Sequence, residues 1–316
     1  MFKIKSFKHN TPILRHIPGP KTIKKKLKRR FSTFYQTHLT RQYADDLYYE
    51  IFGYHIDWKN PRDLNEKINY LAFKTDTRQW SLWADKYAVR EYVRSKGLGH
   101  ILVPLYGKWD DANDIDWQSL PQQCVLKANN GSGDAIIIKD KATCNEETIK
   151  EQLNHSLHTN FGIKTAEPHY LRIKPCIIAE KLLQPTDGSP LVDYKVWCFH
   201  GKPYSILTVS ERNNTTNQYK LALYNLNWER IQAIVANNHK NNLPVERPVH
   251  LNQMLNYATI LSEDIPEVRV DFYEIDEQVY FGEMTMTSAA GRMTNYTKEC
   301  LLEMGNQINL DIVRKK

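Results

Sequence analysis

The sequence contains no run of about 18 apolar residues, the length that a membrane-spanning helix needs. Its N-terminus also lacks the apolar stretch of a cleaved secretory signal. The five cysteines are scattered and form no Cys-x-x-Cys pair, a usage typical of reduced thiols in a cytosolic protein. These absences predict a cytoplasmic protein.

Several familiar catalytic motifs are missing as well. The chain has no Gly-x-Ser-x-Gly nucleophile elbow, no His-Glu-x-x-His zinc motif and no Walker-type P-loop. Its histidines also lack metal-ligand spacing. Triad hydrolases, zinc proteases and P-loop nucleotidases are therefore not expected.

The first 44 residues contain no aspartate or glutamate, although they hold 12 lysines and arginines. The remainder carries 36 acidic side chains and fewer basic ones, so the excess positive charge belongs to this arm. A nucleic-acid partner is therefore not expected, because the main body lacks a basic surplus. Within the arm, basic residues followed by aromatic ones favour peripheral contact with an anionic membrane surface, although a solvated or packed helix fits the same pattern.

A glycine-rich loop lies within residues 125–134, VLKANNGSGD. One apolar run precedes the loop and another, AIII, follows it, which predicts a strand, a loop and a strand. Glycines let a backbone approach an anion, and Lys127 places a positive charge beside the loop. On this segment alone, a phosphate-binding loop and an ordinary hairpin with a surface lysine are equally good interpretations.

Two carboxylates lie among apolar residues near the C-terminus. Asp271 in VRVDFY and Glu283 in YFGEMT are predicted to lie on neighbouring strands of a hairpin. Such carboxylates are uncommon without a partner, and Mg²⁺ prefers oxygen ligands that it shares with nucleotide phosphates. Arg269 projects from the same strand face as Asp271. A magnesium site is the favoured interpretation, and neutralisation of a structural carboxylate by Arg269 is the alternative.

Other charged residues are weaker candidates. Glu180 and Lys181 end an apolar run and could meet an adenine edge, although such a pair is more often a surface pair. Asp193 and Lys195 share one strand face, where a phosphate contact and an exposed ion pair both fit. Arg212 follows a predicted strand and is a further candidate for anion contact.

Periodicity and turn residues predict a mixed α+β chain. Helices are expected at 43–52, 77–95, 145–159 and 251–261 and at the C-terminus. Strands are expected at 101–106, within 124–139, and at 177–183, 193–199, 204–210, 268–275 and 279–286. We further expect Asn65 to cap a helix and residues 211–247 to be less regular. Much of the apolar surface of the helix at 77–95 is expected from Leu82, Tyr87, Val89 and Tyr92.

Taken in order, these segments resemble an ATP-grasp enzyme. The signals WADKYAVREYV, LKANNGSGD and IIAEKLL are similar to those of D-alanine–D-alanine ligases. The closer resemblance is to the TupA-like ATP-grasp family, which is linked to teichuronopeptide and surface-polysaccharide biosynthesis. It covers roughly residues 45–295 and includes NPRDLNEKINY, EPHY, DYKVWCF, RVDFY and YFGEMT.

The resemblance implies an ATP-grasp fold of the α+β class, in which two α/β subdomains clamp ATP beside a helical N-terminal region. The implied domains are a basic arm at 1–44, an N-terminal α/β region at 45–110, a small lid subdomain at 111–190 and a large subdomain with the metal site at 191–316.

The resemblance also implies a role for each matching residue. For ATP, the implied contacts are Lys86, Lys127, Asn130, Gly131, Ser132, Gly133, Glu180, Lys181, Leu183 and Asp187. For Mg²⁺ they are Asp271, Glu283 and Thr285, and for the transferred phosphoryl group they are Lys195, Arg212 and Arg269. ATP-grasp enzymes often have asparagine where this chain has Thr285, which is a departure from the pattern.

The implied activity is ATP- and Mg²⁺-dependent carboxylate–amine ligation through an acyl phosphate. The expected substrates are an amino acid or another amine and a sugar carboxylate, such as a uronic acid of a capsular or O-antigen polysaccharide, free or lipid-linked. A glycosyltransferase of the same pathway, with Asp271 and Glu283 holding a nucleotide-sugar metal, is the alternative. Lys127 and the glycine loop weigh against the glycosyltransferase. A non-catalytic nucleotide-binding protein is a third interpretation, and the charged residues Lys86, Lys127, Asp271 and Glu283 weigh against it.

Overall fold

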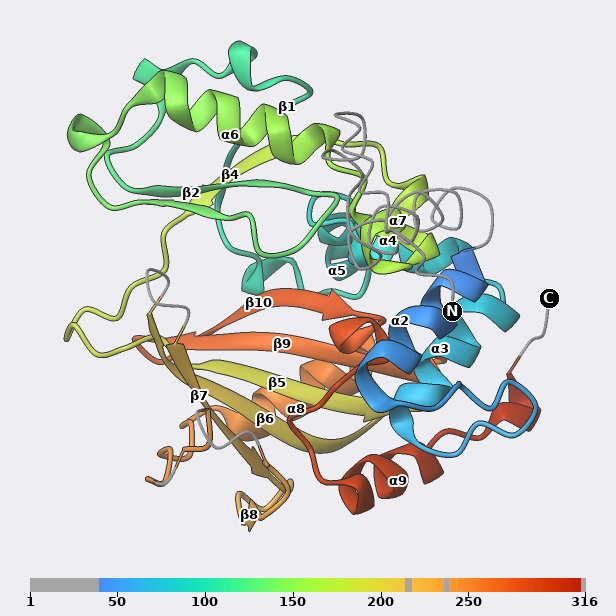
Figure 1. The fold of residues 1–316 in the computed structure, drawn as a ribbon. Helices are drawn as coiled ribbons and strands as arrows, with labels where there is room; N and C mark the ends of the chain where they lie inside the picture. Colours follow the sequence, from blue (N-terminus) through green and yellow to red (C-terminus); the bar gives the residue numbers. More distant parts are fainter. Residues whose placement is uncertain (1–39, 214–217, 236–238, 242, 314–316) are drawn as a thin grey trace, which may run out of the picture.

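The computed structural model describes residues 40–213, 218–235, 239–241 and 243–313. Figure 1 shows a smaller sheet in the upper half, a larger sheet in the lower half and a group of helices beside them. Nearly all of the predicted basic arm, up to position 39, lies outside the described residues, and so does the membrane contact predicted for it. Among the described residues, no helix combines the length and apolarity needed to cross a membrane.

The smaller sheet has four antiparallel strands. In spatial order they are β1 (Leu105–Trp109), β4 (Ile177–Lys181), β2 (Cys124–Ala128) and β3 (Ile136–Ile138). Helix α6 (Glu146–His158) packs on this sheet through Ile149, Leu153 and Leu157, which recur every fourth position and so share one face. The predicted strand, loop and strand are confirmed, because the glycine loop joins β2 to β3.

The larger sheet has six antiparallel strands. In spatial order they are β10 (Gln278–Thr285), β9 (Glu267–Ile275), β5 (Asp193–Phe199), β6 (Lys202–Asn213), β7 (Gln218–Tyr224) and β8 (Arg230–Ile231). Helix α8 (Leu251–Leu261) contributes Met254 and Ala258 to the same core as Val196 and Val270. Because side chains alternate along a strand, the neighbours of those valines, Lys195 and Asp271, point to the opposite face.

The other helices lie beside the sheets (Figure 1). They are α2 (Thr40–Phe52), α3 (Leu64–Lys74), α4 (Arg78–Ala84), α5 (Val89–Ser95), α7 (Phe161–Thr165) and α9 (Lys298–Asn306). Short 3₁₀ turns are η2 (Gly99–Ile101), η3 (Ala112–Asp114), η4 (Trp117–Ser119), η5 (Lys141–Thr143), η6 (Pro168–Arg172), η7 (Ser288–Gly291) and η8 (Leu310–Ile312). Helix α3 contacts α9 and η7, and α4 contacts η6 and β10.

The single helix predicted at 77–95 is wrong, because the structure has two helices there. Asp85 interrupts the helix with an extended backbone, and its carboxylate accepts hydrogen bonds from the backbone N–H groups of Tyr87 and Ala88. Short acidic side chains favour such turns because they compete for backbone donors. Of the four predicted apolar residues, Val89 is buried in the core and Tyr92 packs against it, as expected. Leu82 and Tyr87 are 39% and 40% exposed, so their predicted contribution to apolar packing is wrong.

Two smaller predictions are also wrong. A strand was expected at 101–106, but η2 occupies its first position and β1 begins only at Leu105. The N-cap of α3 is Asp63, which accepts from the N–H of Glu66, so Asn65 lies inside the helix. In the described part of 211–247, irregular segments separate short strands, as expected, but β7 and β8 were not predicted. Only the last four residues of β7 are buried, so its sequence pattern was a weak signal.

The four predicted domain ranges stay a prediction. Strand β1 belongs to the smaller sheet, although its residues fall within the range 45–110.

Candidate active site

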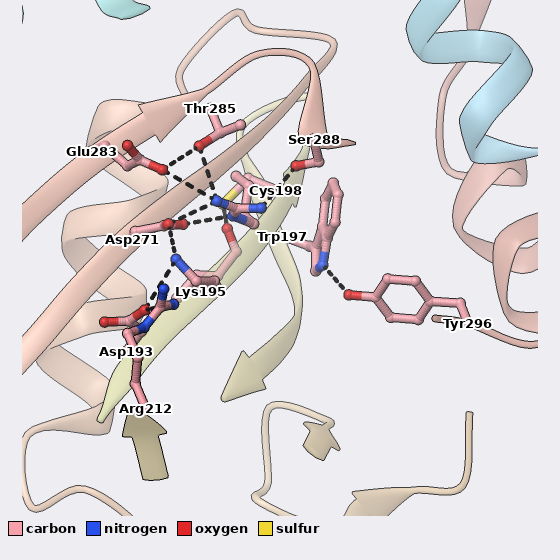
Figure 2. A network of polar contacts seen from close by, with 12 residues as sticks. Asp193, Lys195, Trp197, Cys198, Arg212, Asp271, Glu283, Thr285, Ser288 and Tyr296 are labelled. Carbon is pink, nitrogen blue, oxygen red and sulfur yellow. Dashed lines mark hydrogen bonds and ion pairs between the residues drawn. The ribbon is translucent and has the colours of Figure 1, made fainter. Parts of the chain in front are cut away.

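A cluster of charged side chains lies on the larger sheet (Figure 2). It occupies the face opposite to the one on which Val196 and Val270 share a core with α8. Asp271 on β9 is almost fully buried, and Arg269 donates to it from Nε at 2.7 Å and from Nη2 at 2.8 Å. Lys195 on β5 is the register partner of Asp271 and forms an ion pair with the same carboxylate. The pairing of β5 with β9 therefore fixes the spacing of these three charges.

Glu283 reaches this cluster through an irregularity in β10. The register shifts between Phe281 and Glu283, which leaves Gly282 without a partner and sets Glu283 opposite Asp271. A Cβ atom on Gly282 would lie 3.0 Å from the carbonyl oxygen of Asp271 and 3.2 Å from the ring of Tyr273. A glycine therefore suits this close approach, and the bulge brings the two carboxylates together.

Glu283 and Thr285 contact the outer edge of the Arg269 guanidinium. Its Nη2 lies 3.3 Å from Oε1 of Glu283 and 3.1 Å from Oγ1 of Thr285. The Thr285 hydroxyl in turn donates to Glu283 at 3.0 Å. Burial acts to raise the pKa of Glu283, but nearby positive charges outweigh it and lower the pKa to about 2. Those charges belong to Lys195, Lys86 and Arg269.

The network continues along the sheet to Asp193 and Arg212. Arg212 donates to Asp193 at 2.9 Å, and Asp193 lies 3.5 Å from Nζ of Lys195. The side chain of Arg212 is 48% exposed, so this end of the network is open to solvent. Tyr273 also bonds to Asp193, and burial together with the carboxylates of Asp193 and Glu283 raises its pKa well above the usual value. Its hydroxyl is therefore a neutral hydrogen-bond donor.

Lys86 connects the glycine loop with this network. It follows α4, and its Nζ donates to the carbonyl oxygen of Gly131 in the loop. Burial lowers the pKa of Lys86, while the negative charges of Glu283 and Asp134 act in the opposite direction. The ammonium group thus contacts the glycine loop and is stabilised in its charged form by the Glu283 carboxylate.

The glycine loop is held by its neighbours at one end and exposed at its tip. Asn130 is buried and donates from Nδ2 to the carbonyl oxygen of Leu157 at 3.3 Å. A Cβ atom on Gly131 would lie 3.6 Å from the ring of Phe161, so the loop packs against α7. Ser132 and Gly133 are exposed, and Gly133 has a φ of +85°, a conformation that favours glycine.

A second ion-pair group lies on the smaller sheet. Lys127 on β2 pairs with Glu180 on β4 at 2.6 Å, and the other oxygen of Glu180 accepts from Arg90 at 2.9 Å. Arg90 also donates to the carbonyl oxygen of Val103 at 2.8 Å. All three charged side chains are largely buried, and Arg90 ties this group to α5.

The three remaining residues predicted for ATP contact do not join these groups. Lys181 and Asp187 are exposed, and Leu183 is half-buried. Asp187 accepts a hydrogen bond from the N–H of Ser189 in the segment after β4, and this bond lowers its pKa. Their contacts with adenine and ribose stay a prediction.

Sequence reasoning missed two residues that position the predicted ones. Asn129 donates to Asp85 at 2.8 Å and accepts from the backbone N–H of Cys176 at 2.7 Å. The backbone carbonyl oxygen of Asn129 also accepts from the backbone N–H of Lys86 at 3.4 Å. Asn129 and Asp85 therefore join the start of the glycine loop to the turn that carries Lys86. The sequence gives one indication of their role, because each residue directly precedes a predicted site residue.

The donor set on β9 and β10 fits Mg²⁺, because all three candidate ligands offer hard oxygen atoms. Asp271, Glu283 and Thr285 converge on Arg269, and the Glu283 side chain is 40% exposed, which leaves it accessible to a ligand. In the part of the chain that the structure describes, no group of three or more His, Cys, Asp or Glu could hold a metal alone. A cation here would therefore share its coordination with phosphate oxygens.

The family model described as TupA-like ATPgrasp matches residues 66–309. The chain belongs to the TupA-like ATP-grasp family. The predictions of this family, of an ATP-grasp fold in the α+β class and of an ATP-grasp enzyme are therefore confirmed.

No functionally curated protein is significantly similar to the chain. Among solved structures, the D-alanine–D-alanine ligase of Bacillus anthracis is 15% identical, with 78% of this chain and 69% of that chain covered and a TM-score of 0.39. The corresponding ligase of Helicobacter pylori is 16% identical over 78% and 69%, with a TM-score of 0.43. An L-amino acid ligase of Bacillus licheniformis is 10% identical over 72% and 46%, with a TM-score of 0.42. These similarities are too low for the substrates of those ligases to be assigned to this chain.

Proposed function

We propose that this chain is an ATP- and Mg²⁺-dependent carboxylate–amine ligase. The observation that carries the proposal is the position of Lys86, whose ammonium group contacts the glycine loop and lowers the pKa of Glu283. A triphosphate placed between the loop and the larger sheet would meet cationic side chains at one end and candidate metal ligands at the other. That arrangement suits phosphoryl transfer, where positioning and charge stabilisation do most of the work.

ATP would take over contacts that protein groups now make with one another. Lys86 would exchange the carbonyl of Gly131 for a phosphate oxygen, and Lys127 would exchange Glu180 for another. Glu180, still paired with Arg90, would then accept from the adenine amino group. The backbone near Lys181 and Leu183 and the Asp187 carboxylate would complete the nucleoside site, and Asn130–Gly133 would cover the phosphates.

Asp271, Glu283 and Thr285 would hold Mg²⁺ together with the phosphates. When bound, the ion supplies positive charge to phosphate oxygens. Arg269 and Lys195 are held beside these ligands by the ion pairs with Asp271, so they are oriented before substrates arrive. Arg212, at the open end of the network, would contact an anionic group of the substrate.

The reaction would form two bonds and break two. A carboxylate oxygen of the acid attacks the γ-phosphorus of ATP, and ADP leaves to give an acyl phosphate. The amine nitrogen then attacks the acyl carbon, phosphate leaves with the oxygen that came from the acid, and the amine loses a proton. Closure of the glycine loop would exclude water, which otherwise hydrolyses the acyl phosphate.

For substrates, we propose an amino acid or another amine and a uronic acid of a surface polysaccharide, on the basis of the family's link to that class of glycan. The basic arm would bring the enzyme to lipid-linked acceptors on the cytoplasmic face of the membrane. A flotation assay with anionic and neutral vesicles tests this proposal on the full chain and on a form without residues 1–39. Binding of the full chain to anionic vesicles alone is expected, and equal binding by the shortened form would contradict it.

The ligase is tested by measuring ADP release from Mg·ATP with pooled amino acids and uronic-acid sugars. Turnover that requires both an acid and an amine supports the proposal, and we expect Glu283→Gln to abolish it. If a nucleotide-sugar binds but ATP does not, the ligase proposal fails and the glycosyltransferase alternative replaces it.

A further inference from the structure

The turn η7 has a backbone conformation that ordinary residues avoid. Ala289 has φ 47° and ψ 31°, Ala290 has φ 52° and ψ 38°, and Gly291 follows with φ 64°. Three successive left-handed residues, two of them alanines, are disfavoured by steric contact between Cβ and the backbone. Such a turn persists only where its surroundings determine it, and turns of this kind concentrate at functional sites.

The residues around the turn contact the proposed catalytic machinery. Ser288 Oγ accepts from Nη1 of Arg269 at 3.1 Å, on the opposite end of the guanidinium from Glu283 (Figure 2). Thr287, one residue earlier, donates to the buried carboxyl group of Glu167. The first residue of the turn therefore contacts the Arg269 guanidinium directly.

Helix α3 holds the far side of the turn through two asparagines. Asn69 donates from Nδ2 to the carbonyl oxygen of Gly291 at 3.0 Å. Asn65 donates to the carbonyl oxygen of Met293 at 3.0 Å and accepts from its N–H at 2.9 Å. Asn65 and Asn69 are four positions apart on α3, so their amides lie on the same face. Both side chains are almost completely buried.

The fit between helix and turn is close. A Cβ atom on Gly291 would lie 2.3 Å from Nδ2 of Asn69 and 2.9 Å from the carbonyl oxygen of Asn65. Lys67, which lies between the two asparagines on α3, serves a different purpose, because it donates to the carbonyl oxygens of Gly305 and Ile308 beside α9. Asn69 therefore binds the last residue of η7, and Asn65 binds the backbone two residues after it.

We propose that Asn65 and Asn69 are positioning residues, which act on the reaction through η7 and Ser288. They hold the left-handed turn, the turn places Ser288 Oγ, and Ser288 fixes the orientation of the Arg269 guanidinium between Asp271 and Glu283. This inference rests on the proposed ligase, because it assumes that Arg269 stabilises the transferred phosphoryl group. It explains why the segment NPRDLNEKINY, far from the phosphate loop in sequence, carries buried amides.

Kinetics of three alanine variants test the proposal. Asn69→Ala and Ser288→Ala each remove one step of the chain of contacts, while Lys67→Ala removes the α9 contacts from the same helix. For Asn69→Ala and Ser288→Ala we expect kcat to fall on the order of tenfold or more, since a slightly misplaced catalytic group costs rate, with KM for ATP changed less than about twofold. Lys67→Ala is expected to lower Tm while kcat is kept. An equal loss of kcat in all three variants would overturn the proposal.

A second readout does not depend on turnover. The ¹⁵N–¹H signal of Arg269 Nε, assigned as the one missing from Arg269→Lys, reports the guanidinium environment. It should shift in Asn69→Ala and Ser288→Ala and stay in place in Lys67→Ala. If the wild type shows no ATP turnover but the signal shifts as expected, the ligase fails and the positioning contact stands. If the signal stays in place in the folded Asn69→Ala and Ser288→Ala proteins, the positioning proposal is wrong whatever the activity.

Discussion

Arg269 and Asp271 stand two residues apart on β9 and form a bidentate ion pair, with donor–acceptor distances of 2.7 and 2.8 Å. The pair is buried, and Lys195 from the neighbouring strand contacts the same carboxylate. One carboxylate thus orients two cations, which links the stability of the larger sheet to the geometry of the proposed site.

Removal of the shared carboxylate is expected to destabilise the fold. Asp271→Asn takes from the buried Arg269 and Lys195 the carboxylate that they share, and loss of one partner of a buried pair costs about 3 kcal/mol. Urea unfolding of the variant measures the free energy of unfolding. Arg212→Met, which breaks the pair of a half-exposed arginine with Asp193 and leaves Asp193 its contact with Lys195, is the control and should cost less than about 1 kcal/mol. Equal effects of the two variants would contradict this expectation.

The sequence was sufficient to predict the hairpins and their charges. Alternation in VRVDFYEI and DYKVWCF correctly placed Asp271, Arg269 and Lys195 on strand faces, because side-chain direction in a strand follows from position alone. The pairing of β5 with β9, which brings Lys195 to Asp271, joins strands far apart in the chain, and no local pattern specifies it.

The contacts between helices and turns were the part that the sequence did not reveal. Asn65 was expected to cap a helix, but it lies inside α3 and binds the backbone at Met293. Asp85 was expected within a helix, but its side chain forms the turn that presents Lys86. In both cases a polar side chain binds a backbone group, and the identity of that group depends on the folded chain.

Lys86 is expected to contribute to ATP affinity. Lys86→Met removes the ammonium group that contacts the glycine loop, so KM for ATP should rise on the order of tenfold in the ADP-release assay. Lys139→Met removes an exposed lysine after β3 and serves as the matched control, with an expected change of less than about twofold. If KM is unchanged in Lys86→Met, this lysine does not contact the phosphates.

Glu267 provides a test of burial that is independent of activity. It is completely buried on β9, neither oxygen has a hydrogen-bond partner among the residues that the structure describes, and burial raises its pKa well above the usual value. The folded state therefore prefers the protonated form, and stability is lost as pH rises above the unfolded pKa near 4.5. Glu267→Gln should remove this loss, so its Tm relative to wild type should increase between about pH 4.5 and 7. A constant difference in Tm across that range would show that the carboxyl group is not buried in this way.

Glu283 is expected to have the opposite pH dependence. Its pKa in the folded state is about 2, against a usual value of 4.5, so its ionised form stabilises the fold above the unfolded pKa. That contribution is lost as pH falls from about 4.5 towards 2. Thermal unfolding of wild type and Glu283→Gln over this range should show a difference that shrinks as pH falls. A difference that grows on acidification would mean that the nearby cations do not stabilise the carboxylate.

The most direct test of the account is to follow an oxygen atom from the acid to phosphate. The carboxylate substrate identified by the ADP-release screen is labelled with ¹⁸O in both carboxylate oxygens and incubated with the amine and Mg·ATP, and the released phosphate is analysed by mass spectrometry. Formation of an acyl phosphate predicts that each phosphate molecule carries one ¹⁸O atom from the acid. Unlabelled phosphate, formed together with the amide product, would contradict the ligase mechanism proposed for Lys195, Arg269 and the carboxylates beside them.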